Sequence, residues 1–229
     1  TSESREICSM NETPFPLIVS AMITFGWLVT FFPSSNTSNN ASISFPSTLY
    51  TFHPKDASFA SRKEAANFFA ERAWEFVASA KLDTATYRFN LVNALDTSSI
   101  DAFWGLGVIS FQRKDYPLAK QLLAKGLISD PTQALMRVDY AIVLLSCYLD
   151  GKDCGTLAEA DAELAQSLKD EPKNANGWMK RSQVAFYQEK YELAWTYFHE
   201  CRTLDILQMD LNFGSQLAEK MPDPKGIFK

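Results

Sequence analysis

The chain has 229 residues, of which 46% are hydrophobic and 21% charged, so it can bury a substantial core and is not disordered throughout. Its formal net charge is −5, with 22 Lys and Arg against 27 Asp and Glu, which disfavours binding to a phosphate backbone. Only 9 Gly and 2 His are present, which leaves little material for phosphate-binding loops or His-based metal sites. These numbers already argue against a nucleic-acid-binding protein and against most enzymes.

The first distinctive element follows a polar N-terminal segment, residues 1–14. Residues 15–32 (FPLIVSAMITFGWLVTFF) contain no charged residue, and their length is close to the minimum for a helix that crosses a bilayer. Three interpretations stay open: a membrane anchor, the hydrophobic part of a cleavable export signal, or a buried helix. We expect a single transmembrane or signal helix, because the polar linker at 33–60 separates this segment from the rest of the chain. Its membrane orientation is not specified, since few basic residues flank it.

The remaining chain, residues 61–221, repeats with a fixed period. Residues 100–133 read as two amphipathic helices joined by the polar turn QRKD. Small residues recur at matching places in four such units, separated by 34 residues except for one interval of 41. In the first helices they are Ala73, Gly107, Ala141 and Ser182, and in the second helices they are Ala85, Ala119, Ala160 and Ala194. The longer interval places a seven-residue insertion between the two helices of the third unit.

This pattern resembles the tetratricopeptide repeat (TPR), a 34-residue helical hairpin with small residues at its eighth and twentieth positions and Pro near its end. The resemblance implies an all-α, right-handed superhelix of about four hairpins. The units would span residues 66–99, 100–133, 134–174 and 175–208, followed by a cap helix at 210–221 and a tail at 222–229. In layout the chain resembles small membrane-anchored or exported bacterial TPR proteins.

The TPR resemblance also implies a binding surface, because the first helix of each unit lines the inner, concave face in this family. Carried onto this chain, the mostly apolar groove consists of Trp74, Trp104, Val108, Phe111, Val138, Ile142, Leu145, Met179, Phe186 and Tyr187. An apolar groove in water needs an occupant. The candidates are a partner protein, a second copy of the chain, or the chain's own cap helix or residues 45–59. The basic residues with which some relatives grip a carboxylate are absent.

No residues converge on a catalytic or metal site in the sequence. We expect His53 in the linker and His199 on the exterior of a second helix, so neither has partners for catalysis or for metal binding. We therefore expect no enzyme activity, no metal and no cofactor. Cys147 and Cys154 flank the inserted loop of the third unit, and this spacing permits a disulfide in an oxidising compartment without requiring one.

The sequence as a whole predicts a non-catalytic scaffold or adaptor that binds a protein partner through its apolar concave face. We expect it to be anchored to a membrane through residues 15–32 or exported, to the periplasm or cell envelope if the host is bacterial, and not to bind nucleic acid. Self-association is an alternative to a different partner protein. A second hypothesis is a structural accessory subunit of a larger membrane complex, held mainly by its transmembrane helix.

Overall fold

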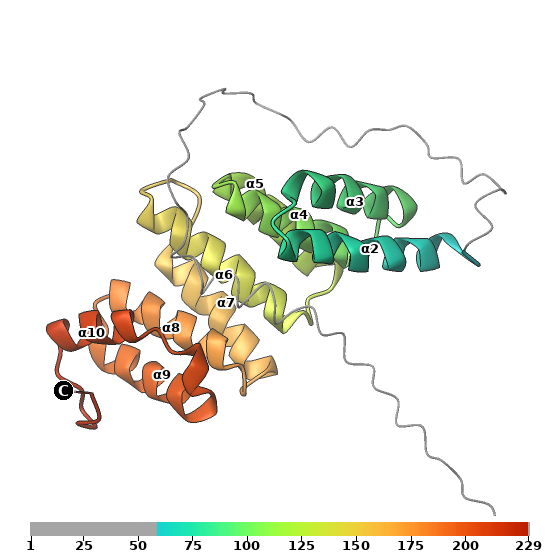
Figure 1. Cartoon of the computed structure of the whole chain (residues 1–229). Helices are drawn as coiled ribbons and strands as arrows, with labels where there is room; N and C mark the ends of the chain where they lie inside the picture. Colours follow the sequence, from blue (N-terminus) through green and yellow to red (C-terminus); the bar gives the residue numbers. More distant parts are fainter. Residues whose placement is uncertain (1–58, 229) are drawn as a thin grey trace, which may run out of the picture.

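The computed structural model describes residues 59–228, and within this range the chain is all-α, without a strand (Figure 1). The hydrophobic segment 15–32 and most of the polar linker lie outside the described residues, so the transmembrane or signal helix stays a prediction. No helix between residues 59 and 228 combines the length and the apolar character that crossing a membrane requires.

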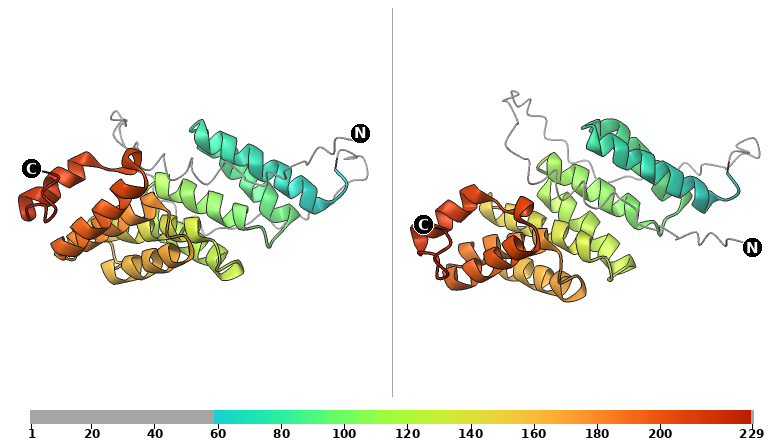
Figure 2. Two further views of the ribbon diagram at one scale, coloured as in Figure 1. Left: turned by 90° about the horizontal axis from the view of Figure 1, so that it is seen from below. Right: turned by 60° about the horizontal axis from the view of Figure 1, so that its bottom comes forward.

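The described helices form consecutive hairpins. They are α2 (Arg62–Ala78), α3 (Leu82–Leu95), α4 (Ile100–Gln112), α5 (Tyr116–Ser129), α6 (Ala134–Leu149), α7 (Leu157–Asp170), α8 (Ala175–Tyr187), α9 (Tyr191–Leu204), the short 3-10 helix η1 (Ile206–Gln208) and α10 (Leu211–Lys220). The pairs α2–α3, α4–α5, α6–α7 and α8–α9 pack most closely and stack in chain order (Figures 1 and 2). The predicted all-α arrangement of helical repeats is confirmed.

The first helices of neighbouring hairpins, α2, α4, α6 and α8, also pack against one another, whereas the second helices do so less. The first helices therefore lie on the tighter side of the stack. We call the surface that they form the inner face.

Small residues lie where the two helices of a hairpin cross. Ala119 and its three counterparts at the twentieth position are fully buried. A Cβ atom added to Gly107 would lie 2.8 Å from the Leu123 side chain, which would have to move to make room. In the fourth hairpin the Ser182 hydroxyl donates a hydrogen bond to the Ala194 carbonyl, at 2.7 Å. The period in the sequence thus records the positions at which helices approach too closely for larger side chains.

The turn inside each hairpin has the same backbone form. One residue in each turn is left-handed, and these are Ala80, Lys114, Gly151 and Glu189, with φ values of 57, 61, 66 and 60°. In the second hairpin the Lys114 N–H donates to the Phe111 carbonyl and the next N–H donates to the Ser110 carbonyl. Such bonds satisfy carbonyls that the end of a helix leaves without a partner.

The seven-residue insertion of the third hairpin divides into two parts. Helix α6 has 16 residues where α4 and α8 have 13, so three inserted residues add almost one helical turn. The others form a loop that ends at Thr156, whose side chain and that of Glu159 cap the start of α7 reciprocally. Cys154 in this loop forms a disulfide with Cys147 in the last turn of α6. The sequence spacing permits this disulfide without requiring it, and in the structure the disulfide is present.

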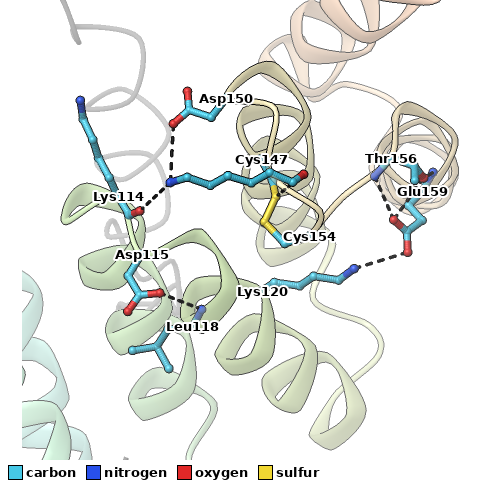
Figure 3. The surroundings of a disulfide bond; sticks show 10 residues. Lys114, Asp115, Leu118, Lys120, Cys147, Asp150, Cys154, Thr156 and Glu159 are labelled. Carbon is cyan, nitrogen blue, oxygen red and sulfur yellow. Dashed lines mark hydrogen bonds and ion pairs between the residues drawn. A yellow bond between two sulfur atoms is a disulfide. The ribbon is translucent and has the colours of Figure 1, made fainter. Parts of the chain in front are cut away.

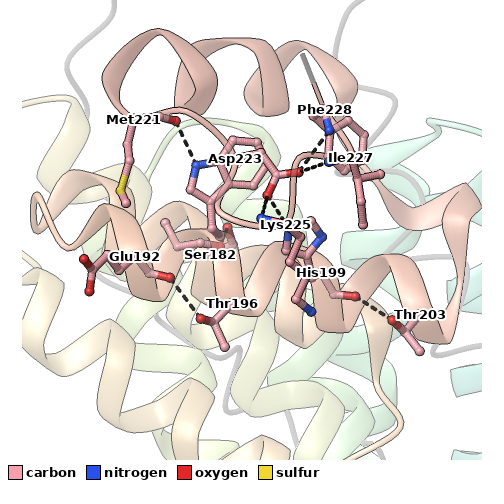
Figure 4. A network of polar contacts seen from close by, with 12 residues as sticks. Ser182, Glu192, Thr196, His199, Thr203, Met221, Asp223, Lys225, Ile227 and Phe228 are labelled. Atoms are coloured by element: carbon pink, nitrogen blue, oxygen red, sulfur yellow. Dashed lines mark hydrogen bonds and ion pairs between the residues drawn. The ribbon is translucent and has the colours of Figure 1, made fainter.

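The C-terminal residues close the stack. Helix α10 buries Phe213, Gly214 and Leu217, and a Cβ atom on Gly214 would lie 2.8 Å from the Phe198 ring. Residues 222–228 then fold back over α9, where the Asp223 carboxylate accepts hydrogen bonds from the backbone N–H groups of residues 225, 227 and 228 (Figure 4). The last hairpin is therefore covered by a helix and by a tail that the sequence pattern did not describe.

Candidate functional site

The predicted groove residues all lie on the first helices, but most of them are buried. Those with at most 7% of their surface exposed are Trp74, Trp104, Val108, Val138, Ile142, Leu145 and Met179. Phe111 and Phe186 are half-buried, and Tyr187 is 38% exposed. The inner face is therefore largely closed by contacts within the chain.

The structure distributes these residues among separate apolar clusters. The Trp74 ring lies edge-on to Phe89 and to Trp104, with centroid distances of 5.1 and 5.8 Å, in the cluster of the first two hairpins. Val138, Ile142 and Leu145 pack with Ala160 and Leu164 from α7. Met179 and Phe186 belong to the cluster around Trp195 and Phe198. Phe111 contacts the first and second of these clusters and joins them.

A line of polar contacts connects the first helices across hairpin boundaries. The Trp74 Nε1–H donates to Asp101 at 2.9 Å, and the Trp104 Nε1–H donates to Asp139 at 2.7 Å. The next hairpin contributes Lys180, whose ammonium donates to Gln183 at 3.3 Å. We call Trp74, Asp101, Trp104, Asp139 and Lys180 the polar seam. Its hydrogen bonds fix how α2, α4 and α6 are aligned, because buried polar groups require these specific partners.

Burial shifts the pKa values of two charged residues of the polar seam, Asp139 and Lys180. Burial raises the pKa of Asp139 to about 7, against the opposing effects of the Trp104 hydrogen bond and the nearby positive charge of Lys180. Burial also lowers the pKa of Lys180, whereas the negative charge of Asp210 and smaller effects of Cys201 and Asp139 act in the other direction. The members of the seam are buried except for Asp101, which is half-buried.

The most exposed of the predicted groove residues, Tyr187, lies at the end of α8. The Tyr187 ring packs edge-on against Phe186, at 5.3 Å, and Phe186 in turn contacts Tyr191 and Phe213 at 5.7 and 5.4 Å. A cavity of about 470 Å³ lies beside Tyr191 and is lined by residues 189–193 and Met221. We call Phe186, Tyr187 and Tyr191 the aromatic edge. It offers a partly exposed aromatic side chain supported by rings that are packed in place.

A second apolar surface was not predicted from the sequence. After α9, Ile206, Leu207 and Leu211 are 65, 87 and 64% exposed, and we call them the apolar turn. The Asp205 carboxylate accepts the Leu207 N–H at 2.9 Å. The first two hairpins end in the same turn, with Ser98 and Thr132 in the place of Leu207. If the four units are aligned at Asp205 and its counterparts, the sequence shows that Leu207 takes the place of a polar residue.

His199 is buried, with 2% of its surface exposed, and the expectation that it lies on the exterior is wrong. Its Nε2 lies 2.8 Å from the Asp223 carboxylate (Figure 4). The Trp195 ring stacks on its ring, and the Phe228 ring lies tilted beside it. The exterior of α9 was expected to face solvent, but the folded-back tail covers it. Although desolvation acts to raise it, the pKa of Asp223 is lowered to about 2 by its backbone hydrogen bonds and by His199.

This pair therefore serves the structure of the tail. Among residues 59–228, no group of three or more His, Cys, Asp or Glu side chains is arranged to hold a metal ion.

Comparisons with known proteins agree with this architecture. No family model matches the sequence, and no curated relative is found for it. Among solved structures, PilF of Pseudomonas aeruginosa is similar with a TM-score of 0.61 and 20% identity, over 70% of this chain and 69% of that one. The TPR protein YrrB has a TM-score of 0.54 and 17% identity, over 69 and 79% of the two chains.

MamA of Desulfovibrio magneticus RS-1 has a TM-score of 0.57 and 13% identity, over 70 and 86% of the two chains. At such low identities, these similarities concern the fold. The stacked hairpins, their small crossing residues and these neighbours together show that residues 59–228 adopt the fold of tetratricopeptide-repeat proteins.

Proposed function

We propose that the protein is a non-catalytic scaffold that binds a protein partner at the aromatic edge of its inner face. The observation that carries this proposal is the exposure of Tyr187, which stands out on an inner face whose other predicted lining residues are half-buried or buried. Tyrosine provides a large contact area with few rotatable bonds, which makes it a frequent anchor of protein interfaces. Of the predicted groove, we thus assign direct contact with the partner to Tyr187, next to Phe186.

Neighbouring aromatic residues support this edge. Phe186 is held between Tyr191 and Phe213, so the exposed ring of Tyr187 rests on a surface that is already ordered. An ordered surface loses little conformational entropy when a partner binds. Among the similar structures, YrrB is described as having an unusual peptide-binding site.

We further propose that residues 15–32 anchor the scaffold to a membrane or direct its export. The uncharged length of this segment supports the proposal. The disulfide between Cys147 and Cys154 supports it as well, because disulfides form and persist mainly in oxidising compartments outside the cytoplasm.

The test uses the full chain, purified in mild detergent from its native membranes together with bound proteins after mild cross-linking. Tyr187→Ser is expected to lower the recovery of the main partner about tenfold or more, the effect of losing an interface anchor. Tyr87→Ser is the matched control, because Tyr87 is also exposed but lies on the second helix α3. Equal recovery with both variants would refute the aromatic edge. Recovery that depends only on residues 15–32 would favour the accessory subunit.

A further inference from the structure

The loop inserted in the third hairpin is closed covalently and lies tightly on α6. Cys147, in the last turn of α6, is buried, and Cys154 is bonded to it with a Cα–Cα distance of 5.8 Å (Figure 3). Between them the Lys152 N–H donates to the Cys147 carbonyl, at 3.0 Å. A Cβ atom on Gly155 would lie 2.6 Å from the Leu144 carbonyl oxygen, so the chain leaves the loop in direct contact with the α6 backbone. The loop is therefore held against α6 both before and after Lys152, which fixes the position of this residue.

From this loop Lys152 reaches the second hairpin. Its ammonium donates to the Lys114 carbonyl at 3.4 Å and lies over the Tyr116 ring, 4.4 Å from the centroid. The Asp150 carboxylate lies 3.7 Å from the same ammonium (Figure 3). Lys114 is the left-handed residue of the second hairpin's turn, and Tyr116 begins α5. One side chain of the third hairpin thus holds the turn of the second by a hydrogen bond and a cation–π contact.

The corresponding edge of the first two hairpins is connected differently. There Arg113 forms an ion pair with Asp83, at 2.6 Å, and both side chains are exposed to solvent. Exposed pairs of this kind contribute little to stability. The Lys152 side chain is as exposed as that of Arg113, at 43%, but its loop is closed by a covalent bond that the other hairpins lack within residues 59–228.

We infer that the disulfide-closed loop is a redox-dependent clamp between the second and third hairpins. While the Cys147–Cys154 bond is intact, Lys152 is held against Lys114 and Tyr116. Once the bond is reduced, the loop gains conformational freedom and the clamp releases, so that the two halves of the stack move more independently.

The chemistry of release requires a thiol reductant. A dithiol attacks Cys154, the more accessible sulfur, and forms a mixed disulfide while Cys147 leaves as a thiolate. The second thiol of the reductant then displaces Cys154, so the reductant ends as a disulfide, and two electrons and two protons pass to the two cysteines. Because Cys147 is buried, its thiolate is a poor leaving group in this setting, and we expect reduction to be slow.

Amide hydrogen exchange on the full chain tests the clamp, with and without dithiothreitol. Reduction is expected to speed exchange at least fivefold both in residues 147–155 and in residues 113–118 of the second hairpin. Residues 79–85, in the turn of the first hairpin, serve as an internal control and should not change. Faster exchange confined to the loop would overturn the proposal, as would free thiols at Cys147 and Cys154 in the untreated protein, detected by alkylation and mass spectrometry.

Two variants separate the disulfide from the lysine. Lys152→Met keeps the covalent bond and should speed exchange in residues 113–118 without dithiothreitol. Cys154→Ser leaves the buried Cys147 in the core and should reproduce the reduced protein, with no further response to dithiothreitol. If Lys152→Met leaves residues 113–118 as protected as in the natural sequence, the clamp does not act through this side chain and the inference is wrong.

Discussion

The inner face and the apolar turn contain similar residues in opposite environments. On the inner face, Trp104 and Ile142 are nearly inaccessible because the neighbouring hairpins close over them. In the apolar turn, Ile206 and Leu207 follow the last hairpin and extend into solvent. The same kind of side chain is therefore core in one place and surface in the other, depending on whether another hairpin stacks beyond it.

The difference shows where a repeat protein can display apolar surface without losing stability. Within the stack most apolar side chains contribute to cohesion, although some, such as Tyr87 and Ile128 on second helices, are exposed. At the end of the stack the Asp205 hydrogen bond holds the turn in the same form as in earlier hairpins, so leucine replaces a polar residue without changing the backbone. Exposed apolar patches of this kind commonly mark contact surfaces.

The largest effect is expected from placing a charge inside the stack. Ala119→Arg forces a long charged side chain between α4 and α5 and should lower the free energy of unfolding by about 3 kcal/mol or more. Gln121→Arg adds the same charge at an exposed position of the same helix and should have little effect. Chemical denaturation followed by circular dichroism measures both variants. Similar midpoints for the two would contradict the close crossing at Ala119.

The closure of the last hairpin is tested at Asp223. Asp223→Ala removes the acceptor of three backbone N–H groups and the partner of His199, and should release the tail at a loss of about 2 to 4 kcal/mol. Because the pKa of Asp223 is lowered to about 2, its contribution should be present above about pH 4 and be lost as the pH falls toward 2.

Limited proteolysis reports the release, together with tryptophan fluorescence, to which Trp195 contributes as one of five tryptophans. Lys225→Ala is the control for Asp223→Ala, because it keeps the backbone N–H and changes only an exposed side chain. A tail that stays protected in Asp223→Ala would show that its apolar contacts suffice.

The buried polar seam predicts an unusual dependence on pH. Burial raises the pKa of Asp139 to about 7, so this carboxyl favours the folded state while it is protonated. Its contribution is present below about pH 4 and is lost as the pH rises to 7. The Asp139→Asn variant has no carboxyl to ionise and does not lose stability in this way. Relative to the natural sequence, its free energy of unfolding should rise by about 2 kcal/mol when the pH is raised from 5 to 8.

Urea unfolding at the two pH values measures the change. Asp101→Asn is the matched control, because Asp101 also accepts a bond from a tryptophan but is only half-buried. A pH dependence unaltered by Asp139→Asn would mean that the charge of Asp139 is compensated in the folded state.

The smallest effect on stability is expected at the apolar turn. The double change Ile206→Ser and Leu207→Ser removes exposed side chains whose backbone is held by Asp205, and should alter the free energy of unfolding by less than about 0.5 kcal/mol. Thermal unfolding compared with Ile128→Ser, an isolated exposed residue of α5, measures this. A clear loss of stability would show that the turn packs against another part of the protein.

The fold was accessible from the sequence because helix crossings require small residues. Ala119 and Ala194 mark the closest approaches, and such a steric requirement repeats with the hairpin. The solvent exposure of a side chain was harder to predict, because it depends on which other parts of the chain pack against it. The family pattern places Trp104 on the inner face, but its burial arises from Asp139 and from the Trp74 ring in other hairpins.

The C-terminal tail was missed for a related reason. Residues 222–228 contain no periodic pattern, and their position depends on one acid that gathers N–H groups around it and on an aromatic residue, Phe228, that stacks on Trp195. Asp223 and Phe228 of this tail both contact His199 and contribute to its burial. The spacing of apolar residues along α9 indicates which of its faces packs within the hairpin. It does not indicate that residues 222–228 cover another face.

The left-handed residues of the hairpin turns have a practical consequence for engineering. Ala80, Lys114 and Glu189 adopt positive φ values that glycine reaches with less steric hindrance, whereas Gly151 already has the preferred residue. Glycine at the other three places should each relieve about 1 kcal/mol of steric conflict, partly offset by the greater freedom of glycine in the unfolded chain. A more heat-resistant form of the protein is thus reachable through changes at these bends, with Ala80 and Lys114 the safer choices, because Glu189 lies beside the aromatic edge.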